Sequence, residues 1–340
     1  MANIIVTGGA GYIGSHTCKA LAVSGHTPVT YDNLSTGNRW AVRWGPLEER
    51  DILDEARLAA VFAHHRPAAV MHFAAASLVG ESMGRPALYY AANVRGGLNV
   101  LDACRAADCR AVVMSSTCAV YGTPARLPIT EATPTDPINP YGASKLMLER
   151  ILADYRRAYG IASLALRFFN AAGADADGEI GERRPSESHL VPLVLDAVTG
   201  LRPPVTVLGT DYPTPDGTAV RDYLHVSDIA DVHLRALAHL EADGEGGAIN
   251  IGAGQGSSVN EVIAMAEAVT GRSVPRRSGA RRPGDPPVLV ADAEAATRLL
   301  GPGLLPRSDL ATIVANAWAW QSSEAYMRTF KAAGASAAGT

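Results

Sequence analysis

The chain has 340 residues, of which 47% are apolar and 19% charged, and its formal net charge at pH 7 is −4. This composition supplies a large core and excludes a mainly disordered chain. The weak negative charge gives no reason to expect nucleic acid or an anionic membrane as a partner. No apolar run approaches the ~20 residues of a membrane span, and the first residues lack a basic leader pattern. We therefore expect a cytoplasmic protein with one large α/β unit or two lobes.

The four cysteines, at positions 18, 104, 109 and 118, do not form a paired Cys-x-x-Cys pattern. They give no sign of a zinc site, and they are too few for a disulfide framework in a chain of this length. We expect buried free thiols and no bound metal ion.

The first part of the chain has the pattern of a dinucleotide-binding unit. Residues 3–7, NIIVT, predict a strand, and GGAGYIG at residues 8–14 precedes a helical stretch that ends before Gly25. Glycines in such a turn let the backbone approach a pyrophosphate, and the helix N-terminus offers N–H groups to its negative charge. The next predicted strand ends in Asp32, whose carboxylate can bind a ribose 2′-hydroxyl and repel a 2′-phosphate. These features predict NAD in preference to NADP.

Predicted strands and helices then alternate as far as residue 170, with one long helix expected at residues 86–107. Such alternation predicts a doubly wound parallel sheet with helices on both faces. Ligands of these sheets bind beyond the carboxyl ends of the strands. Candidate residues just past predicted strands are Asp51, Ile52, Phe73, Ala74, Ala75 and Thr117.

Tyr141 and Lys145 are four residues apart in NPYGASKLMLE, near the start of a helix predicted at residues 142–159. They therefore share one helix face, and an ammonium near a phenol favours the phenolate, which can act as a base near neutral pH. Thr117 carries a hydroxyl that can donate and accept, so it could face a substrate oxygen opposite Tyr141. Taken alone, the Tyr-Lys pair also fits an ordinary helix surface, and Thr117 also fits a turn or helix cap.

The composition changes after Asn170, where residues 171–187 are polar, charged and rich in glycine. This change predicts a long excursion and the start of a smaller C-terminal α/β lobe. The expected domains are a Rossmann domain at residues 1–170, with its sheet completed by segments at about 220–255, a substrate lobe mainly at 171–330, and a tail at 331–340.

Within this lobe, residues 211–240 predict a loop that leads to a helix, and further helices are expected near 292–300 and 308–324, where they would close the lobe. Arg221 and Arg282 stand out because the planar guanidinium suits phosphate oxygens. Arginines at a surface are also commonly solvated without touching a ligand.

The chain resembles the extended short-chain dehydrogenase/reductase superfamily. It has, in the same order, the glycine turn, the acidic end of the second strand and the Thr-Tyr-Lys set of that superfamily. The segments GGAGYIGSH, YDNLSTG, HFAAASLVGES, SSTCAVYG, NPYGASKLMLE and LRFFNAAGA narrow the resemblance to UDP-glucose 4-epimerases. The most specific segment is DYPTPDGTAVRDYLHVSDIADVH, which contains Arg221. The similarity extends from the first strand to about Leu300.

The resemblance implies an NAD-dependent isomerase of galactose and nucleotide-sugar metabolism that reversibly interconverts UDP-glucose and UDP-galactose. Tyr141 would act as the base, Lys145 would bind the nicotinamide ribose, and Thr117 would meet the sugar. Carbon 4 would give hydride to retained NAD while Tyr141 takes the hydroxyl proton. The resulting 4-keto sugar would turn over and take the hydride back on its other face.

Two sets of contact residues combine the strand-end pattern with positions that the resemblance implies. The residues expected to contact NAD are Gly8, Gly11, Tyr12, Ile13, Gly14, Asp32, Asn33, Asp51, Ile52, Phe73, Ala74, Ala75, Asn93, Tyr141, Lys145 and Phe169. Those expected to contact the UDP-sugar are Thr117, Tyr141, Asn170, Leu190, Thr206, Leu208, Arg221, Arg282 and Asp285.

Two positions depart from the pattern of the relatives or leave specificity open. Ser77 stands where several relatives have a lysine, so one pyrophosphate contact is missing or replaced. Leu289 occupies a position whose size governs acceptance of N-acetylated sugars. Leucine is intermediate in size, which leaves turnover of UDP-N-acetylhexosamines open.

Other nucleotide-sugar enzymes on this scaffold stay as alternatives, namely a pentose 4-epimerase, a decarboxylase or a 4,6-dehydratase. The dehydratase is disfavoured because its acid–base groups follow the active-site threonine, where this chain has Cys118 and Ala119. An NAD-binding regulator without turnover would not need Tyr141 and Lys145. The resemblance also implies a homodimer that pairs residues 86–107 and 142–159 in a four-helix contact.

Overall fold

The computed structural model describes residues 1–184, 186–282 and 284–329, and the chain forms two units. The first unit comprises Met1–Phe168, Ile229–Ile251 and Asp292–Leu304. The second comprises Phe169–Asp228, Gly252–Ala291 and the described residues from Leu305 onward. The tail predicted at residues 331–340 lies outside the described residues.

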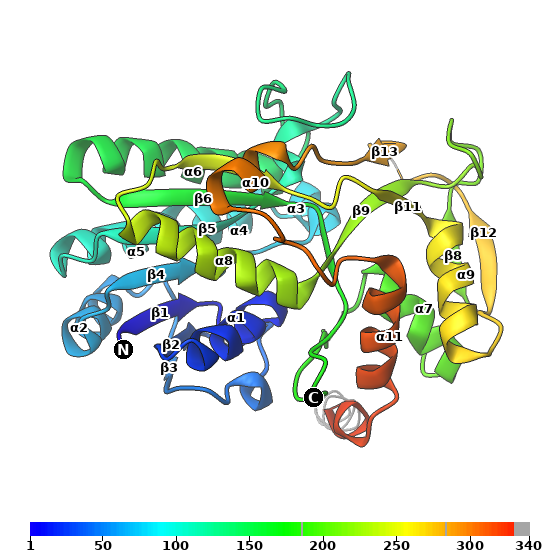
Figure 1. Ribbon diagram of the computed structural model, residues 1–340, viewed down its shortest axis with the longest axis horizontal. Helices are drawn as coiled ribbons and strands as arrows, with labels where there is room; N and C mark the ends of the chain where they lie inside the picture. The colour runs from blue at the N-terminus through cyan, green and yellow to red at the C-terminus, as the bar shows by residue number, and fades with distance from the viewer. Residues whose placement is uncertain (185, 283, 330–340) are drawn as a thin grey trace. The chain divides into compact units, whose positions relative to one another are not determined.

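The first unit is built on a seven-stranded parallel sheet with the strand order β10-β6-β5-β4-β1-β2-β3 (Figure 1). Its strands are β1 (Asn3–Thr7), β2 (Thr27–Asp32), β3 (Leu47–Glu49), β4 (Ala69–His72), β5 (Ala111–Thr117), β6 (Ala162–Phe168) and β10 (Gly247–Ile251). Apart from the edge strand β3, the strands are mostly apolar and buried, as expected for a parallel sheet covered on both faces. The doubly wound parallel sheet predicted from the alternation of elements is confirmed.

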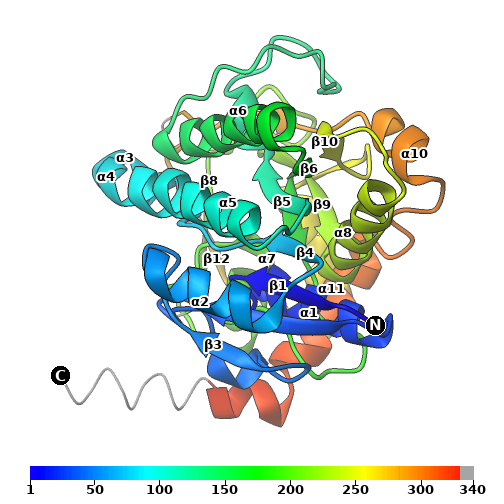
Figure 2. The same cartoon turned by 90° about the vertical axis from the view of Figure 1, so that its left-hand side faces the viewer.

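Helices cover both faces of this sheet (Figure 2). They are α1 (Tyr12–Val23), α2 (Glu55–His65), α3 (Val79–Gly84), α4 (Pro86–Tyr89), α5 (Gly96–Ala106), α6 (Pro140–Tyr159), α8 (Val226–Glu241, in this unit from Ile229) and α10 (Glu294–Leu300). Short η1 (Arg39–Ala41) and η3 (Cys118–Tyr121) are 3-10 turns, and η2 (Tyr90–Arg95) is a π-helix.

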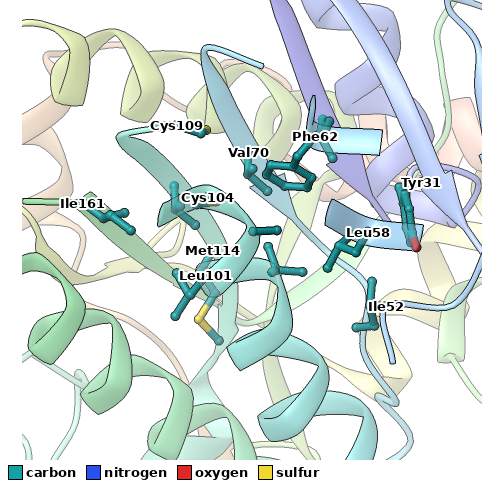
Figure 3. Close-up of a cluster of buried hydrophobic side chains, with 14 of the residues drawn as sticks. Tyr31, Ile52, Leu58, Phe62, Val70, Leu101, Cys104, Cys109, Met114 and Ile161 are labelled. Atoms are coloured by element: carbon teal, nitrogen blue, oxygen red, sulfur yellow. The ribbon is translucent and has the colours of Figure 1, made fainter. Parts of the chain in front are cut away.

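One core cluster of the first unit lies between the sheet and α2, α5 and α6. Leu58 and Phe62 from α2 and Leu101 from α5 pack there against strand residues such as Val70 and Met114 (Figure 3). Burying each of these large apolar side chains contributes roughly 1.5–3 kcal/mol. This packing fixes the sheet and therefore the loops at the carboxyl ends of its strands.

One predicted element of the first unit is only partly correct. The sequence predicts a single helix at residues 86–107, whereas the structure has α4, then the π-helical η2, then α5. The amide of Asn93, inside η2, bonds the backbone of Ala76, which lies outside the helix. A π-helical turn is rare and is frequently found at functional sites.

The described residues of the second unit form two small sheets and several helices. The strand β9 (Val220–His225) pairs with β7 (Asn170–Ala172), β11 (Gly256–Ser258) and β13 (Val288–Leu289), and β8 (Val205–Leu208) pairs with β12 (Arg276–Gly279). The helices are α7 (Leu190–Thr199), α9 (Val259–Thr270) and α11 (Leu310–Gln321), and residues 324–329 are also helical. Apolar residues of α7, α9 and α11 form a core with β8 and β9.

Two predictions for the C-terminal half are wrong in detail. The segment 211–240 is not a loop followed by a helix, because β9 lies between the two. The helix expected near residues 292–300 is α10, and it belongs to the first unit, where it packs near β10. Among the described residues, no helix combines the length and apolarity needed to cross a membrane.

Candidate functional site

The glycine turn after β1 forms a close backbone approach and an open helix start. Gly8 has φ +73°, and a Cβ at this position would lie 2.6 Å from the backbone nitrogen of Ala74. Gly11 is the N-cap residue of α1 and provides no side-chain cap. A helix start without a capping side chain can offer its first N–H groups and its dipole to an anion.

Asp32 closes the second strand beside this turn. Its carboxylate accepts the backbone N–H of Ala10 at 3.0 Å and that of Leu34 at 2.8 Å. Burial raises the pKa of the Asp32 carboxyl, and the two backbone N–H groups oppose that rise. Asn33 and Asp51, two further residues predicted to contact NAD, are in direct contact. The Asn33 amide donates to the Asp51 carboxylate at 2.8 Å.

Hydrogen bonds connect the loop after β4 to the end of β1 and, through Asn93, to α6, the helix of Tyr141 and Lys145. Ala74 donates its backbone N–H to Thr7 at 3.0 Å, and the ring of Phe73 packs 4.7 Å from that of His233. Asn93 is buried, bonds both backbone groups of Ala76 and donates to the Ser144 hydroxyl at 2.8 Å. Asn93 therefore fixes this loop to α6.

Tyr141 and Lys145 lie in the first two turns of α6. Asn139 caps this helix by accepting the Gly142 N–H at 2.8 Å, and a Cβ on Gly142 would lie 2.4 Å from the Ala119 oxygen. Glycine at this position therefore lets the start of α6 approach η3 closely. The ring of Tyr141 packs edge-on against Tyr89 with 6.4 Å between the ring centroids.

Lys145 is a buried cation with one defined backbone contact. It is only 2% exposed, and its Nζ donates to the carbonyl oxygen of Ser115 at 2.9 Å. Burial lowers the pKa of Lys145 to about 8, and the carboxylate of Glu149 opposes that shift. The ammonium is thus held at the end of β5, one helical turn from Tyr141.

Thr117 is buried at the last position of β5, and its side chain caps the next turn. Its hydroxyl oxygen accepts the backbone N–H of Ala119 at 3.1 Å. The capping role that the sequence left open is therefore present. Because a hydroxyl can accept and donate at once, the cap leaves the hydrogen of Thr117 available to another oxygen.

The residues predicted to contact the UDP-sugar, apart from Thr117 and Tyr141, belong to the second unit, as does Phe169 from the cofactor set. Asn170 starts β7 and Leu289 lies on β13, and both strands pair with β9, the strand of Arg221. The guanidinium of Arg221 donates to the carboxylate of Asp285 and to the Val220 oxygen. The structure thus brings Arg221 and Asp285 together.

The remaining members of this set lie on other elements. Thr206 and Leu208 are on β8, and Leu190 is the first residue of α7. The hydroxyl of Thr206 accepts from Arg277 at 3.1 Å, a contact that the sequence did not suggest. Arg282 is exposed.

Two carboxylates next to predicted site residues were not expected from the sequence. The carboxylate of Asp222, next to Arg221, is buried and accepts backbone N–H bonds from Ala253, Gly254 and Ala291. Glu149 follows Lys145 by four residues on α6 and ion-pairs with Arg167 of β6. The four-residue spacing of Lys145 and Glu149 was a signal available in the sequence, whereas the partners of Asp222 had none.

The parallel sheet, the glycine turn after β1 and the Tyr-x-x-x-Lys helix after β5 define a dinucleotide-binding enzyme of the short-chain dehydrogenase/reductase type. Residues 4–252 match the NAD dependent epimerase/dehydratase family. The chain belongs to this family.

Within this family, the chain is similar to proteins named UDP-glucose 4-epimerase. A UDP-glucose 4-epimerase from Rhizobium leguminosarum bv. trifolii is 49% identical over 319 residues, which cover 94% of this chain and 97% of that protein. The crystal structure of UDP-glucose 4-epimerase from Brucella ovis in complex with NAD has a TM-score of 0.91 and 51% identity, and the match covers 94% and 98% of the two chains. That from Bifidobacterium longum in complex with NAD⁺ and UDP has a TM-score of 0.89 and 36% identity, with 95% and 99% covered. The resemblance to UDP-glucose 4-epimerases is confirmed.

Proposed function

We propose that this protein reversibly interconverts UDP-glucose and UDP-galactose by inverting carbon 4 through a 4-keto sugar, with tightly bound NAD as the transient hydride acceptor. The observation that carries the proposal is the start of α6, where buried Lys145 follows Tyr141 by one helical turn. Relatives that match 94% of the chain and are named UDP-glucose 4-epimerase support the choice of substrate.

The residues of the first unit fit NAD. The close approach of Gly8 to Ala74 leaves no room for a side chain, and Gly11 leaves the start of α1 uncapped, as a pyrophosphate requires. The Asp32 carboxylate suits a ribose 2′-hydroxyl and disfavours a 2′-phosphate. When bound, NAD supplies the acceptor and the donor for the hydride of carbon 4.

Tyr141 is the base and acid of the proposed reaction. The Lys145 ammonium, held on the Ser115 oxygen, favours the phenolate of Tyr141 because a nearby positive charge stabilises the ionised form. The phenolate takes the proton of the sugar 4-hydroxyl and returns it after the sugar has turned over. Thr117 donates its hydroxyl hydrogen to the same sugar oxygen.

The second unit holds the UDP moiety in this proposal. The bonds from Arg221 to Asp285 and Val220 fix the guanidinium and use only some of its five N–H donors. The others can bind diphosphate oxygens together with Arg282. The other UDP contacts are Asn170, Leu190, Thr206, Leu208 and Asp285.

The domain roles, the assembly and the location are further parts of the proposal. We assign NAD binding to the first unit and UDP-sugar binding mainly to the second. Apolar side chains exposed on α6 (Met147, Tyr159) and on α4 and η2 (Leu88, Tyr90) support a homodimer through these helices. We place the enzyme in the cytoplasm.

The test is to incubate the purified protein with UDP-galactose, without added NAD, and to follow the sugar by NMR. We expect UDP-glucose to form with retained cofactor. In Tyr141→Phe, turnover should fall by about 10²–10⁴-fold, as is typical when an acid–base group is lost. Tyr159→Phe, which makes the same change at an exposed tyrosine of the same helix, is the matched control. An unchanged sugar after NAD is supplied, or normal turnover by Tyr141→Phe, would contradict the proposal.

A further inference from the structure

A buried ion pair lies one helical turn beyond Lys145. Glu149 of α6 and Arg167 of β6 have side chains that are only 6% and 9% exposed. The Nε of Arg167 donates to Glu149 at 3.0 Å, and its Nη2 donates to the other carboxylate oxygen. Such a bidentate pair is directional and costly to bury, so its position next to Lys145 requires an explanation.

The pair is connected to the same strand end that holds Lys145. The hydroxyl of Ser116 donates to Glu149 at 2.5 Å, and the oxygen of the preceding residue, Ser115, accepts from Lys145. Two successive turns of α6 are therefore attached to neighbouring residues of β5. Arg167 also donates to the Tyr121 hydroxyl at 2.7 Å, which extends the connection to η3.

The charges in this region are unevenly matched. Two cations, Lys145 and Arg167, face one buried carboxylate, Glu149, and burial disfavours all three charges. Glu149 opposes the loss of the Lys145 proton, whereas burial promotes it. Arg167 neutralises part of the Glu149 charge, so it limits how strongly Lys145 is stabilised as a cation.

Among the described residues, Glu149 is the one charged group found to act on the Lys145 pKa. The titratable groups around it and its ion pair are Tyr141 on the same helix, Tyr89 from α4, His72 from β4, Tyr121 from η3, and Glu131, which acts on Tyr121. Burial and Lys145 lower the pKa of His72 to about 3, so this imidazole is neutral near pH 7.

We propose that Glu149 and Arg167 form a positioning pair that holds Lys145 at the end of β5 and sets its charge for the reaction. This role rests on the function proposed above. Glu149 keeps Lys145 protonated, and protonated Lys145 favours the Tyr141 phenolate. Arg167 moderates that effect and fixes the carboxylate in place.

The proposal predicts opposite effects for the two partners. Glu149→Gln removes a negative charge and leaves Arg167 unpaired, so Lys145 should lose its proton at lower pH, and Tyr141, with less support from that ammonium, should ionise at higher pH. Arg167→Gln removes a positive charge, so Lys145 should keep its proton to higher pH and Tyr141 should ionise at lower pH. A shift of about one pH unit in each direction is expected for a single neighbouring charge. The double variant removes both charges and should return close to the wild-type behaviour.

The experiment is to measure the pH profile of kcat/KM with UDP-galactose for the holoenzyme of wild type, Glu149→Gln, Arg167→Gln and the double variant. We expect the acidic limb, set by Tyr141, to move to higher pH and the alkaline limb, set by Lys145, to move to lower pH in Glu149→Gln. Both limbs should move the other way in Arg167→Gln and should lie within a few tenths of a unit of wild type in the double variant. Arg202→Gln, which unpairs the buried carboxylate of Asp196 in the second unit, is the control and should leave the limbs unchanged.

A second readout does not require turnover. The ultraviolet absorbance of tyrosinate, taken as the difference between each variant and the same variant carrying Tyr141→Phe, reports the ionisation of Tyr141 directly. The pH at which Tyr141 ionises should rise in Glu149→Gln and fall in Arg167→Gln even if wild type leaves UDP-galactose unchanged. Failure of the proposed function is therefore distinguished from failure of this inference. The proposal would be overturned if the two single variants shifted the ionisation of Tyr141 in the same direction or left it unchanged. It would also be overturned if the double variant did not return to the wild-type ionisation.

Discussion

Lys145 carries a cost for stability that can be measured. Burial lowers its pKa from 10.5 to about 8, and the side chain is 2% exposed. Because the folded state binds this proton less tightly than the unfolded state does, the ammonium destabilises the native protein fully below about pH 8. The cost declines as the pH rises from about 8 to 10.5, and above that range the amine is neutral in both states.

The change that tests this reasoning is Lys145→Met, which keeps the length of the side chain and removes its charge. The difference between 10.5 and about 8 corresponds to about 3 kcal/mol. Loss of the hydrogen bond to Ser115 offsets about 1 kcal/mol of that gain. We therefore expect Lys145→Met to be about 2 kcal/mol more stable than wild type at pH 7, while its turnover is lost.

The assay is urea unfolding followed by tryptophan fluorescence, at pH 7 and at about pH 9.5, after removal of bound dinucleotide. Removal is needed because a ligand that binds only the folded state adds its own stabilisation. The advantage of Lys145→Met should fall below about 1 kcal/mol at the higher pH. Lys19→Met, at a partly exposed lysine, is the control and should show no such pH dependence. The reasoning is refuted if Lys145→Met is less stable than wild type at pH 7, or if its advantage does not shrink as the pH rises.

Three further substitutions test other parts of the structure. Asp222→Ala removes the acceptor of three backbone N–H bonds and should lower the free energy of unfolding by at least about 2 kcal/mol in denaturation measurements, with Asp222→Asn losing less. Asp32→Asn should lower the preference for NAD over NADP by about tenfold or more in binding titrations, and an unchanged ratio would exclude the proposed role of this carboxylate. Arg221→Met should raise KM for UDP-galactose by about tenfold or more with a smaller change in kcat; a loss confined to kcat would show that Arg221 acts at a later step.

The start of the first unit could be predicted because its signals are local. An apolar run, a glycine turn and an acidic strand end lie within the first 32 residues, and they correspond to β1, the start of α1 and β2. The same holds for Tyr141 and Lys145, whose spacing places them on one helix face without information from the rest of the chain.

The sequence does not reveal that β9 pairs in the sheet of the second unit, because the stability of this strand depends on distant residues. Its sequence, VRDYLH, has charged side chains at its second and third positions, which argue against a buried strand. In the structure, Asp222 is buried because N–H groups from positions 253, 254 and 291 satisfy its carboxylate. The π-helical η2 likewise has no local signal, since Asn93 finds its partners at Ala76 and Ser144.

The setting of Lys145 shows what a spacing rule leaves out. The sequence predicts that Lys145 lies near Tyr141, but it does not predict that the ammonium is buried, since a lysine on an exposed helix face would have the same spacing. The buried position of the Lys145 ammonium depends on its bond to Ser115 at the end of β5. The charge around it depends on Arg167 of β6, which pairs with Glu149 from 18 residues further along the chain. The same burial that costs native stability lowers the pKa of Lys145 toward neutrality and strengthens its interaction with nearby charges, because water no longer screens them. An exposed lysine at this position would avoid the stability cost, but it would have a much smaller effect on the ionisation of Tyr141.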